Sequence, residues 1–147
     1  MRDMMANKQV VHLGNVAVSG TTPATSAYAD LRGFDACTIV VVNNTVTDAG
    51  TASGFTVTFQ ESADTTAAGA STVAAADTTD GTTTVTVTSD SADDAIAGAF
   101  GYRGNDRYVG ITVTGTTGSD ADISVFAVLN KPHRAETTFI GTAVART

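Results

Sequence analysis

The feature that most constrains the fold of this chain is a repeated alternation of apolar and polar residues in short runs. In the run Phe-Thr-Val-Thr-Phe-Gln at 55–60, every second side chain is apolar, and the threonine-rich run at 82–88 follows the same rule after the turn signal Asp80-Gly81. Successive side chains of a β-strand point to opposite faces, so such runs predict strands with one buried face. The β-branched valines and threonines favour the same structure, because they are stiff at χ1 and fit a pleated surface.

Two further runs, 36–43 and 121–129, are apolar on both faces. A strand of this kind is expected either in the middle of a sandwich or beneath a second subunit. Weaker patterns predict a strand pair or one bent strand over 10–18, a strand at 25–31, and a short strand at 71–75 within a long surface connection.

About seven or eight short strands separated by turn signals predict an all-β chain, folded as an antiparallel β-sandwich that is jelly-roll-like. We expect at most one short helix. Its predicted position is 91–97, where a serine or aspartate cap is followed by acidic residues in the first turn.

The length of 147 residues is typical of one domain. We expect an N-terminal arm over 1–9, a β-sandwich domain over 10–132 and a C-terminal tail over 133–147 that carries the apolar pair Phe139-Ile140. The first residues lack the apolar core of a signal peptide, and no stretch has the length needed to span a bilayer. The sequence therefore predicts synthesis in the cytoplasm and no membrane partner.

Charge and motifs argue against several classes of function. The formal net charge is −7 and the eight lysine and arginine residues are scattered, so we expect no nucleic-acid partner. His12 and His133 lie far apart in the sequence, and the loop aspartates are explained as turn and cap formers, so we expect no metal or other cofactor. The single cysteine, Cys37, is interpreted as a small buried apolar residue. No nucleophile-elbow or phosphate-loop motif is present, so the chain is not expected to be an enzyme.

The segment 101–108 concentrates tyrosine and arginine around a glycine. Gly104-Asn105 permits the positive φ of a tight turn, and either neighbouring arginine could lie over a tyrosine ring or pair with Asp106. This predicts a rigid loop, and because tyrosine and arginine are common at binding hot spots, the loop is also a candidate interface. The candidate interface residues are Tyr102, Arg103, Arg107 and Tyr108 in this segment, together with Phe139 and Ile140 in the tail.

Two segments carry a resemblance to a known family: Tyr-Arg-Gly-Asn-Asp-Arg-Tyr-Val at 102–109 and Ala-Val-Leu-Asn-Lys-Pro-His-Arg at 127–134. Over about 14–134, the chain resembles small proteins of tailed-bacteriophage head modules, among which are capsid decoration proteins, also called cement or head-stabilisation proteins. The chain departs from the family's pattern at Asn130-Lys131, where a glycine is usual before the proline, and in its longer tail.

The resemblance implies a structural virion protein that binds the major capsid protein on the outer surface of a phage head and stabilises contacts between capsid subunits. It also implies self-association, commonly as a homotrimer, and a location on the capsid surface of the virion. The sequence leaves open another phage structural component, such as a head–tail or tail protein, and a β-sandwich adhesion module. The two runs that are apolar on both faces agree with self-association, because oligomer interfaces cover apolar surface.

Overall fold

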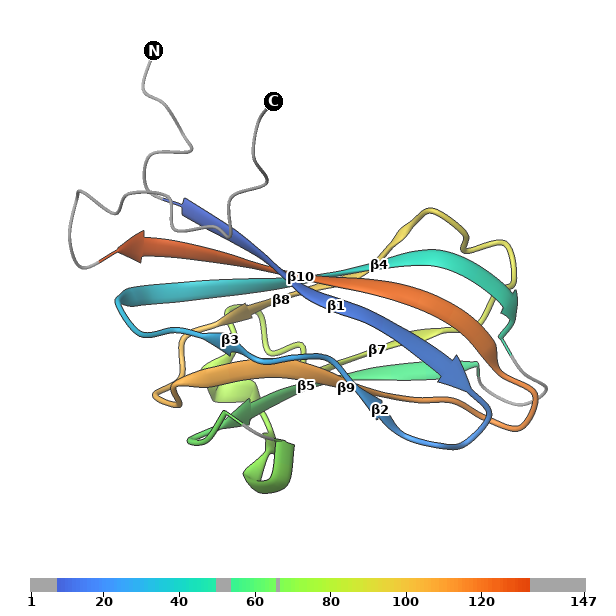
Figure 1. The fold of residues 1–147 in the computed structure, drawn as a ribbon, viewed down its shortest axis with the longest axis horizontal. Coiled ribbons are helices and arrows are strands. Elements are labelled where there is room, and N and C mark those ends of the chain that lie inside the picture. Colours follow the sequence, from blue (N-terminus) through green and yellow to red (C-terminus); the bar gives the residue numbers. More distant parts are fainter. Residues whose placement is uncertain (1–7, 50–53, 66, 133–147) are drawn as a thin grey trace, which may run out of the picture.

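The alternating runs form strands, and the strands build two antiparallel sheets that pack face to face as a β-sandwich (Figure 1). This confirms the predicted all-β class. The computed structural model describes residues 8–49, 54–65 and 67–132. The predicted C-terminal tail and most of the predicted N-terminal arm therefore lie outside the described residues.

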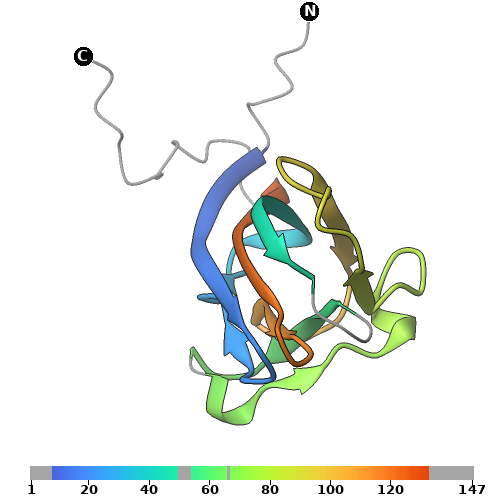
Figure 2. The ribbon, with the colours of Figure 1, turned by 90° about the vertical axis from the view of Figure 1, so that its right-hand side faces the viewer.

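The first sheet has four strands in the order β1-β10-β4-β8, and each strand is antiparallel to its neighbours. Figure 2 shows this sheet arching over the second one, with β1 at one edge and β8 at the other. Its strands are β1 (Lys8–Ser19), β10 (Asp120–Pro132), β4 (Phe34–Asp48) and β8 (Ile96–Tyr102).

The second sheet is built around β9 and β5, which pair with each other. β2 and β3 pair with the other edge of β9, whereas β6 and β7 pair with the other edge of β5. The bounds of its strands are β2 (Ala24–Thr25), β3 (Ala29–Asp30), β5 (Phe55–Ser62), β6 (Ser71–Thr72), β7 (Thr84–Val87) and β9 (Tyr108–Thr114). Two single-turn 3-10 helices lie in the connection from β5 to β7, namely η1 (Ala67–Gly69) and η2 (Ala75–Asp77).

β1 is one bent strand rather than a strand pair, and its bend is a β-bulge. The register with β10 shifts between His12 and Gly14, and Gly14 has a φ of 102°, a conformation that favours glycine. Leu13 is buried before the bulge, whereas Val16 and Val18 are buried after it. The extra residue therefore changes the inward-facing positions of this strand from odd to even numbers.

The predicted helix at 91–97 is wrong, because residues 91–95 form turns and β8 begins directly after them. Asp93, which we expected in the first turn of the helix, accepts a hydrogen bond from the backbone N–H of Val46 in β4. Asn43 of the same strand donates to the backbone of this turn through its side chain and its N–H group. The two side-chain bonds join residues 47 and 49 positions apart, so a local capping pattern does not reveal them.

The core lies between the two sheets and is filled by inward-facing aliphatic and aromatic side chains. Phe59 of β5 stacks on Phe100 of β8 with ring centroids 5.3 Å apart, and the ring of Tyr102 meets Phe59 edge-on at 5.7 Å. All three side chains are buried. This aromatic cluster joins the two sheets close to the segment 101–108.

Replacement of Phe59 by alanine should destabilise the fold strongly, because it removes the ring shared by both aromatic contacts and leaves a cavity. We expect the free energy of unfolding to fall by about 3–5 kcal/mol. Urea denaturation followed by circular dichroism measures this change. Thr58→Ala, on the opposite face of β5, is the control and should change stability by less than about 1 kcal/mol. Similar losses in both variants would contradict this description of the core.

Candidate functional site

The turn at 103–107 is held in place by the side chain of Tyr102. Its hydroxyl donates a hydrogen bond to the Glu61 carboxylate at 2.7 Å and accepts one from the backbone N–H of Asp106 at 2.9 Å. Burial, and to a lesser extent the bond to Glu61, raises the pKa of Tyr102 above its ordinary value. The turn is thereby tied to β5 as well as to β8.

Arg107 is fixed on the other side of the same turn. Its guanidinium donates two hydrogen bonds to the Asp30 carboxylate, at 2.9 and 2.7 Å, and lies 4.9 Å from the centroid of the Tyr108 ring. The ring contact that the sequence suggested is therefore formed, whereas the partner carboxylate is Asp30 rather than Asp106. The hydrogen bonds from Arg107 hold the pKa of the Asp30 carboxyl below its ordinary value. The two side chains are 46% and 44% exposed, so water weakens this pair.

The predicted interface residues in this segment divide into two buried rings and two exposed cations. Tyr102 is 2% exposed and Tyr108 is 7% exposed, so their rings support the loop from inside and are not open to a partner. Of the predicted interface residues in this loop, Arg103 and Arg107 are the exposed ones, and their role in a contact stays a prediction. The apolar pair at 139–140 lies outside the described residues.

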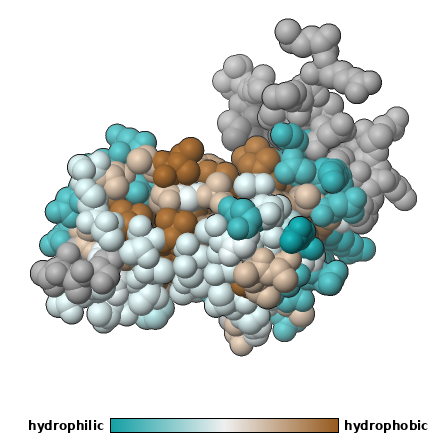
Figure 3. Space-filling view, turned by 180° about the vertical axis from the view of Figure 1, so that it is seen from behind, coloured by the Kyte–Doolittle hydropathy of each residue, from teal (hydrophilic) through white to brown (hydrophobic). Residues whose placement is uncertain are grey.

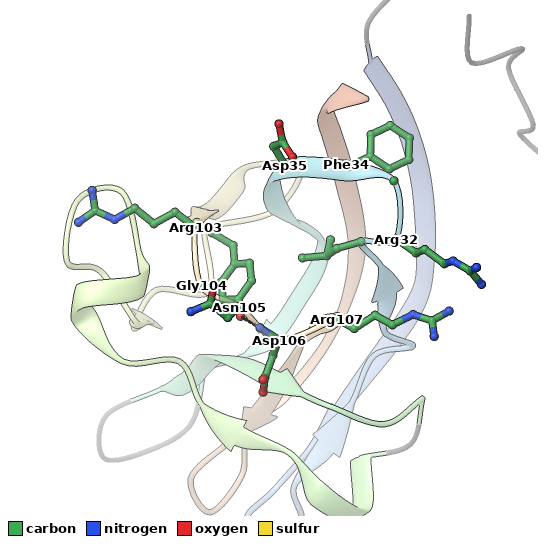
Figure 4. Close-up of a pocket in the computed structure, with 11 residues that line it drawn as sticks. Arg32, Phe34, Asp35, Arg103, Gly104, Asn105, Asp106 and Arg107 are labelled. Atoms are coloured by element: carbon green, nitrogen blue, oxygen red, sulfur yellow. Dashed lines mark hydrogen bonds between the residues drawn. The ribbon is translucent and has the colours of Figure 1, made fainter. Parts of the chain in front are cut away.

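A hollow of about 700 Å³ opens between this turn and the turn at 31–35. Figure 4 shows that Arg103 points to one side of it, while Arg32 and Arg107 point to the other. The three positive charges therefore do not converge on the space between the turns. Convergent polar groups are typical of small-molecule sites, and this hollow lacks such a set among its lining side chains.

A second candidate surface is the outer face of the four-stranded sheet, which the two doubly apolar runs predict. In the view from behind, hydrophobic residues gather on the upper half of the molecule, to which this sheet belongs (Figure 3). Val10 and Ile96, which are 44% and 68% exposed, extend the apolar surface onto both edge strands, and the sequence did not reveal their part in it. The ring of His12 packs on Phe126 with centroids 4.9 Å apart. We define the outer face by the residues Val10, His12, Asn15, Thr38, Val40, Val42, Asn44, Ile96, Ala99, Asp122, Ser124, Phe126 and Val128.

A chain of polar side chains crosses the outer face from β1 to β4. Ser124 Oγ lies 3.0 Å from Asn15 Oδ1 and 3.0 Å from Asn44 Oδ1, and Asn44 Nδ2 donates to the Asp122 carboxylate at 2.7 Å. His12 Nε2 joins this chain at 3.2 Å from Asn15 Oδ1. These polar groups therefore hydrogen-bond to one another along the sheet.

Serine, histidine and aspartate share the outer face, but their contacts differ from those of a catalytic triad. His12 contacts Asn15 instead of Ser124, and Asp122 contacts Asn44 instead of His12. A nucleophilic serine needs a base within hydrogen-bond reach, and that base needs an orienting partner. The arrangement links the three strands side by side instead of activating a hydroxyl.

Metal-ligating side chains do not cluster in the part of the chain that the structure describes. No three His, Cys, Asp or Glu side chains there lie close enough to hold a metal ion. Asp30, the last residue of β3, accepts a hydrogen bond from the backbone N–H of Arg32, and Asp80 accepts one from the backbone N–H of Thr82.

Among the same described residues, no helix is both long enough and apolar enough to cross a membrane.

Cys37 is buried in β4, as the sequence predicts, with 1% of its surface exposed. Burial raises the pKa of its thiol to about 12. The thiolate is the reactive form of cysteine, so this environment makes the side chain inert.

No protein-family model matches the chain, and no curated protein matches it significantly. A solved structure from Bacillus endospore appendages, described as a novel family of disulfide-linked pili, is similar with 19% sequence identity and a TM-score of 0.42. The similarity covers 85% of this chain and 90% of that chain.

We expect Tyr102→Phe to lower the free energy of unfolding by about 1–3 kcal/mol, because it removes the buried hydroxyl that bonds Glu61 and Asp106. Chemical denaturation measures the loss. Arg107→Ala is the comparison variant, since it removes an exposed ion pair and should cost less than about 1 kcal/mol. A Tyr102→Phe protein as stable as the wild type would show that the hydroxyl does not hold the turn.

The thiol of Cys37 should react with iodoacetamide at pH 8 only after the chain is unfolded in urea, and mass spectrometry of the labelled protein measures this. In the unfolded chain the thiol ionises with a pKa of about 8.5, whereas in the folded chain the pKa is about 12. Its contribution to stability is therefore complete below about pH 8.5 and is lost as the pH rises toward 12. Rapid labelling in native buffer would contradict the burial of this residue.

Proposed function

We propose that this protein is a structural subunit of a tailed-phage virion, a capsid decoration protein that binds the outer surface of the head and stabilises contacts between major capsid subunits. The observation that carries the proposal is the apolar outer face of the four-stranded sheet. The assignment to a phage head comes from the resemblance at 102–109 and 127–134.

The outer face supports an assembling role because of where its apolar residues lie. An antiparallel sheet with one face in water normally carries polar residues on that face. Here Val40 and Val42 of β4 and Phe126 and Val128 of β10 lie on the outer side, with Val10 beside them on β1. Val10 is exposed and the other four are partly exposed, and apolar surface left in water marks interaction sites in soluble proteins. Covering this apolar surface is favourable through the hydrophobic effect, and this kind of binding needs no catalytic site.

The proposed mechanism is the sum of many weak contacts. An oligomer that touches several capsid subunits binds more tightly than one copy does, because each later contact is intramolecular. The partners in this proposal are the major capsid protein and other copies of the chain. The net charge of −7 keeps copies soluble at the high local density of a capsid surface.

A second candidate function, a β-sandwich adhesion module or another phage structural part, would use the exposed side chains around the turns at 31–35 and 103–107, because the hollow between these turns lacks convergent polar groups. Phe34 and the exposed arginines around it offer an apolar and a charged contact for a ligand. Binding of labelled glycans or host-cell surfaces to the purified protein tests this alternative. Arg32→Ala and Arg103→Ala should weaken such binding.

Phage particles that carry the protein should release their DNA at a higher temperature than particles that lack it. The difference arises because the bound protein bridges neighbouring capsid subunits. Fluorescence of a DNA-binding dye during heating measures the release. Particles that are stripped and then supplied with purified protein should regain the higher temperature. The variant Val40→Lys should protect less than Thr86→Lys, which places the same charge on the exposed side of β7. Identical release temperatures with and without the wild-type protein would contradict the proposal.

A further inference from the structure

We propose that the outer face binds the same face of a second copy of this chain about a two-fold axis, with the strands of the two copies running in opposite directions. This inference rests on the proposed function and names the partner that covers the outer face.

Charge explains why a second copy can approach on this surface. Each copy carries a net charge of −7, so two copies repel one another over most of their surfaces. The middle of the outer face, from Val128 and Thr38 to Val42 and Ser124, contains no lysine, arginine, aspartate or glutamate. Its titratable group is His12, which packs on Phe126 and contacts Asn15. This is the part of the sheet where apolar attraction meets the least repulsion.

Charge at the two ends of the outer face selects the orientation. Lys8 lies at one end, paired in register with Asn130, and Asp122 lies at the other end, paired with Ala17. A two-fold axis perpendicular to the strands places Lys8 of each copy near Asp122 of the other. An axis parallel to the strands would instead bring the two Asp122 carboxylates together, which like charge disfavours. The antiparallel arrangement therefore combines the apolar centre with two favourable charge contacts.

The area of the outer face matches the requirement of a specific but modest interface. Four strands at about 4.8 Å spacing give a width of about 19 Å, and the eight steps from 130 to 122 give a length of about 26 Å. Each copy would then cover about 500 Å², and the pair about 1,000 Å², which is the lower limit for a specific protein interface. We therefore expect a reversible dimer whose population rises with concentration.

The polar groups of the outer face are compatible with being covered. Asn15, Ser124, Asn44 and Asp122 already hydrogen-bond to one another within one copy. These bonds lower the cost of removing Asn15, Ser124 and Asn44 from water, whereas the charged Asp122 carboxylate is costly to bury unless Lys8 of the second copy faces it. Two sheets of the same twist pack at about −30° with about 10 Å between them, which leaves room for side chains such as Phe126 to interdigitate.

Sedimentation velocity of the full chain over a range of concentrations tests the inference. We expect a monomer–dimer equilibrium, with a dissociation constant at least tenfold higher for Val40→Lys. Thr86→Lys is the matched control on the other sheet and should leave the equilibrium unchanged. Thermal unfolding of each variant is the control for folding, and we expect a cooperative transition in each. A wild-type protein that is monomeric, or a cyclic trimer, would overturn the inference, as would a Val40→Lys protein that still dimerises normally.

A charge exchange tests the orientation and remains informative if one variant is less stable. Lys8→Glu alone and Asp122→Lys alone should each weaken dimerisation, because each places like charges opposite one another. An equal mixture of the two variants should restore dimers, since every positive group then faces a negative one. A mixture that dimerises no better than its components would overturn the antiparallel arrangement.

The outcome separates this inference from the proposed function. A monomeric protein that still protects heated particles would overturn the face-to-face dimer and leave the decoration role standing. A dimer that gives no protection would leave the inference standing and overturn the decoration role.

Discussion

The pairing of β10 with β4 is the interaction on which the rest of the structure depends. The two strands stay in register from Asp120↔Asp48 to Pro132↔Phe34, with two irregularities near one end. Every other strand of the four-stranded sheet attaches to one of them, β1 to β10 and β8 to β4. Because the strands are distant in the sequence, this pair closes the chain into one unit. It also places two apolar faces side by side, one inside the sandwich and one outside it.

The apolar residues on both faces of the β10–β4 pair connect the fold to the proposed function. The inner residues, such as Ile39 and Val125, are fully buried and stabilise the sandwich. The outer residues, such as Val40 and Phe126, are only partly covered by their own chain. A single sandwich therefore buries one face of this strand pair and leaves the other partly in water, where the proposed partner would bind. A partly exposed apolar face of this kind suits the proposed function, in which the protein binds other copies of itself or a capsid.

Sequence reasoning predicted the parts of the fold that depend on local patterns. Alternation at 55–60 and 82–88 identified β5 and β7, and double apolarity at 36–43 and 121–129 identified the two central strands. It failed at 91–97, where the competing partner of Asp93 is a backbone group in another strand.

In the candidate site, too, local sequence patterns predicted which residues matter but not their contacts with distant residues. The tyrosines of the segment 101–108 were recognised, but the burial of Tyr102 was not, because it depends on Phe59 and Glu61 of β5. The partner of Arg107 is Asp30, which lies 77 residues away, and no sequence spacing points to it. The contribution of Val10 to the outer face depends on the register between β1 and β10, which an isolated pattern does not give.

The bulge at Gly14 has a consequence for how this surface can change over generations. The extra residue sets the parity of the first half of β1, so that Val10 and His12 face outward while Val16 and Val18 face the core. A substitution at Gly14 that removed the bulge without shortening the chain would turn the first half of the strand over and exchange its two faces. A single substitution could thus rewrite the outer surface of this edge while the remainder of the sandwich stayed intact.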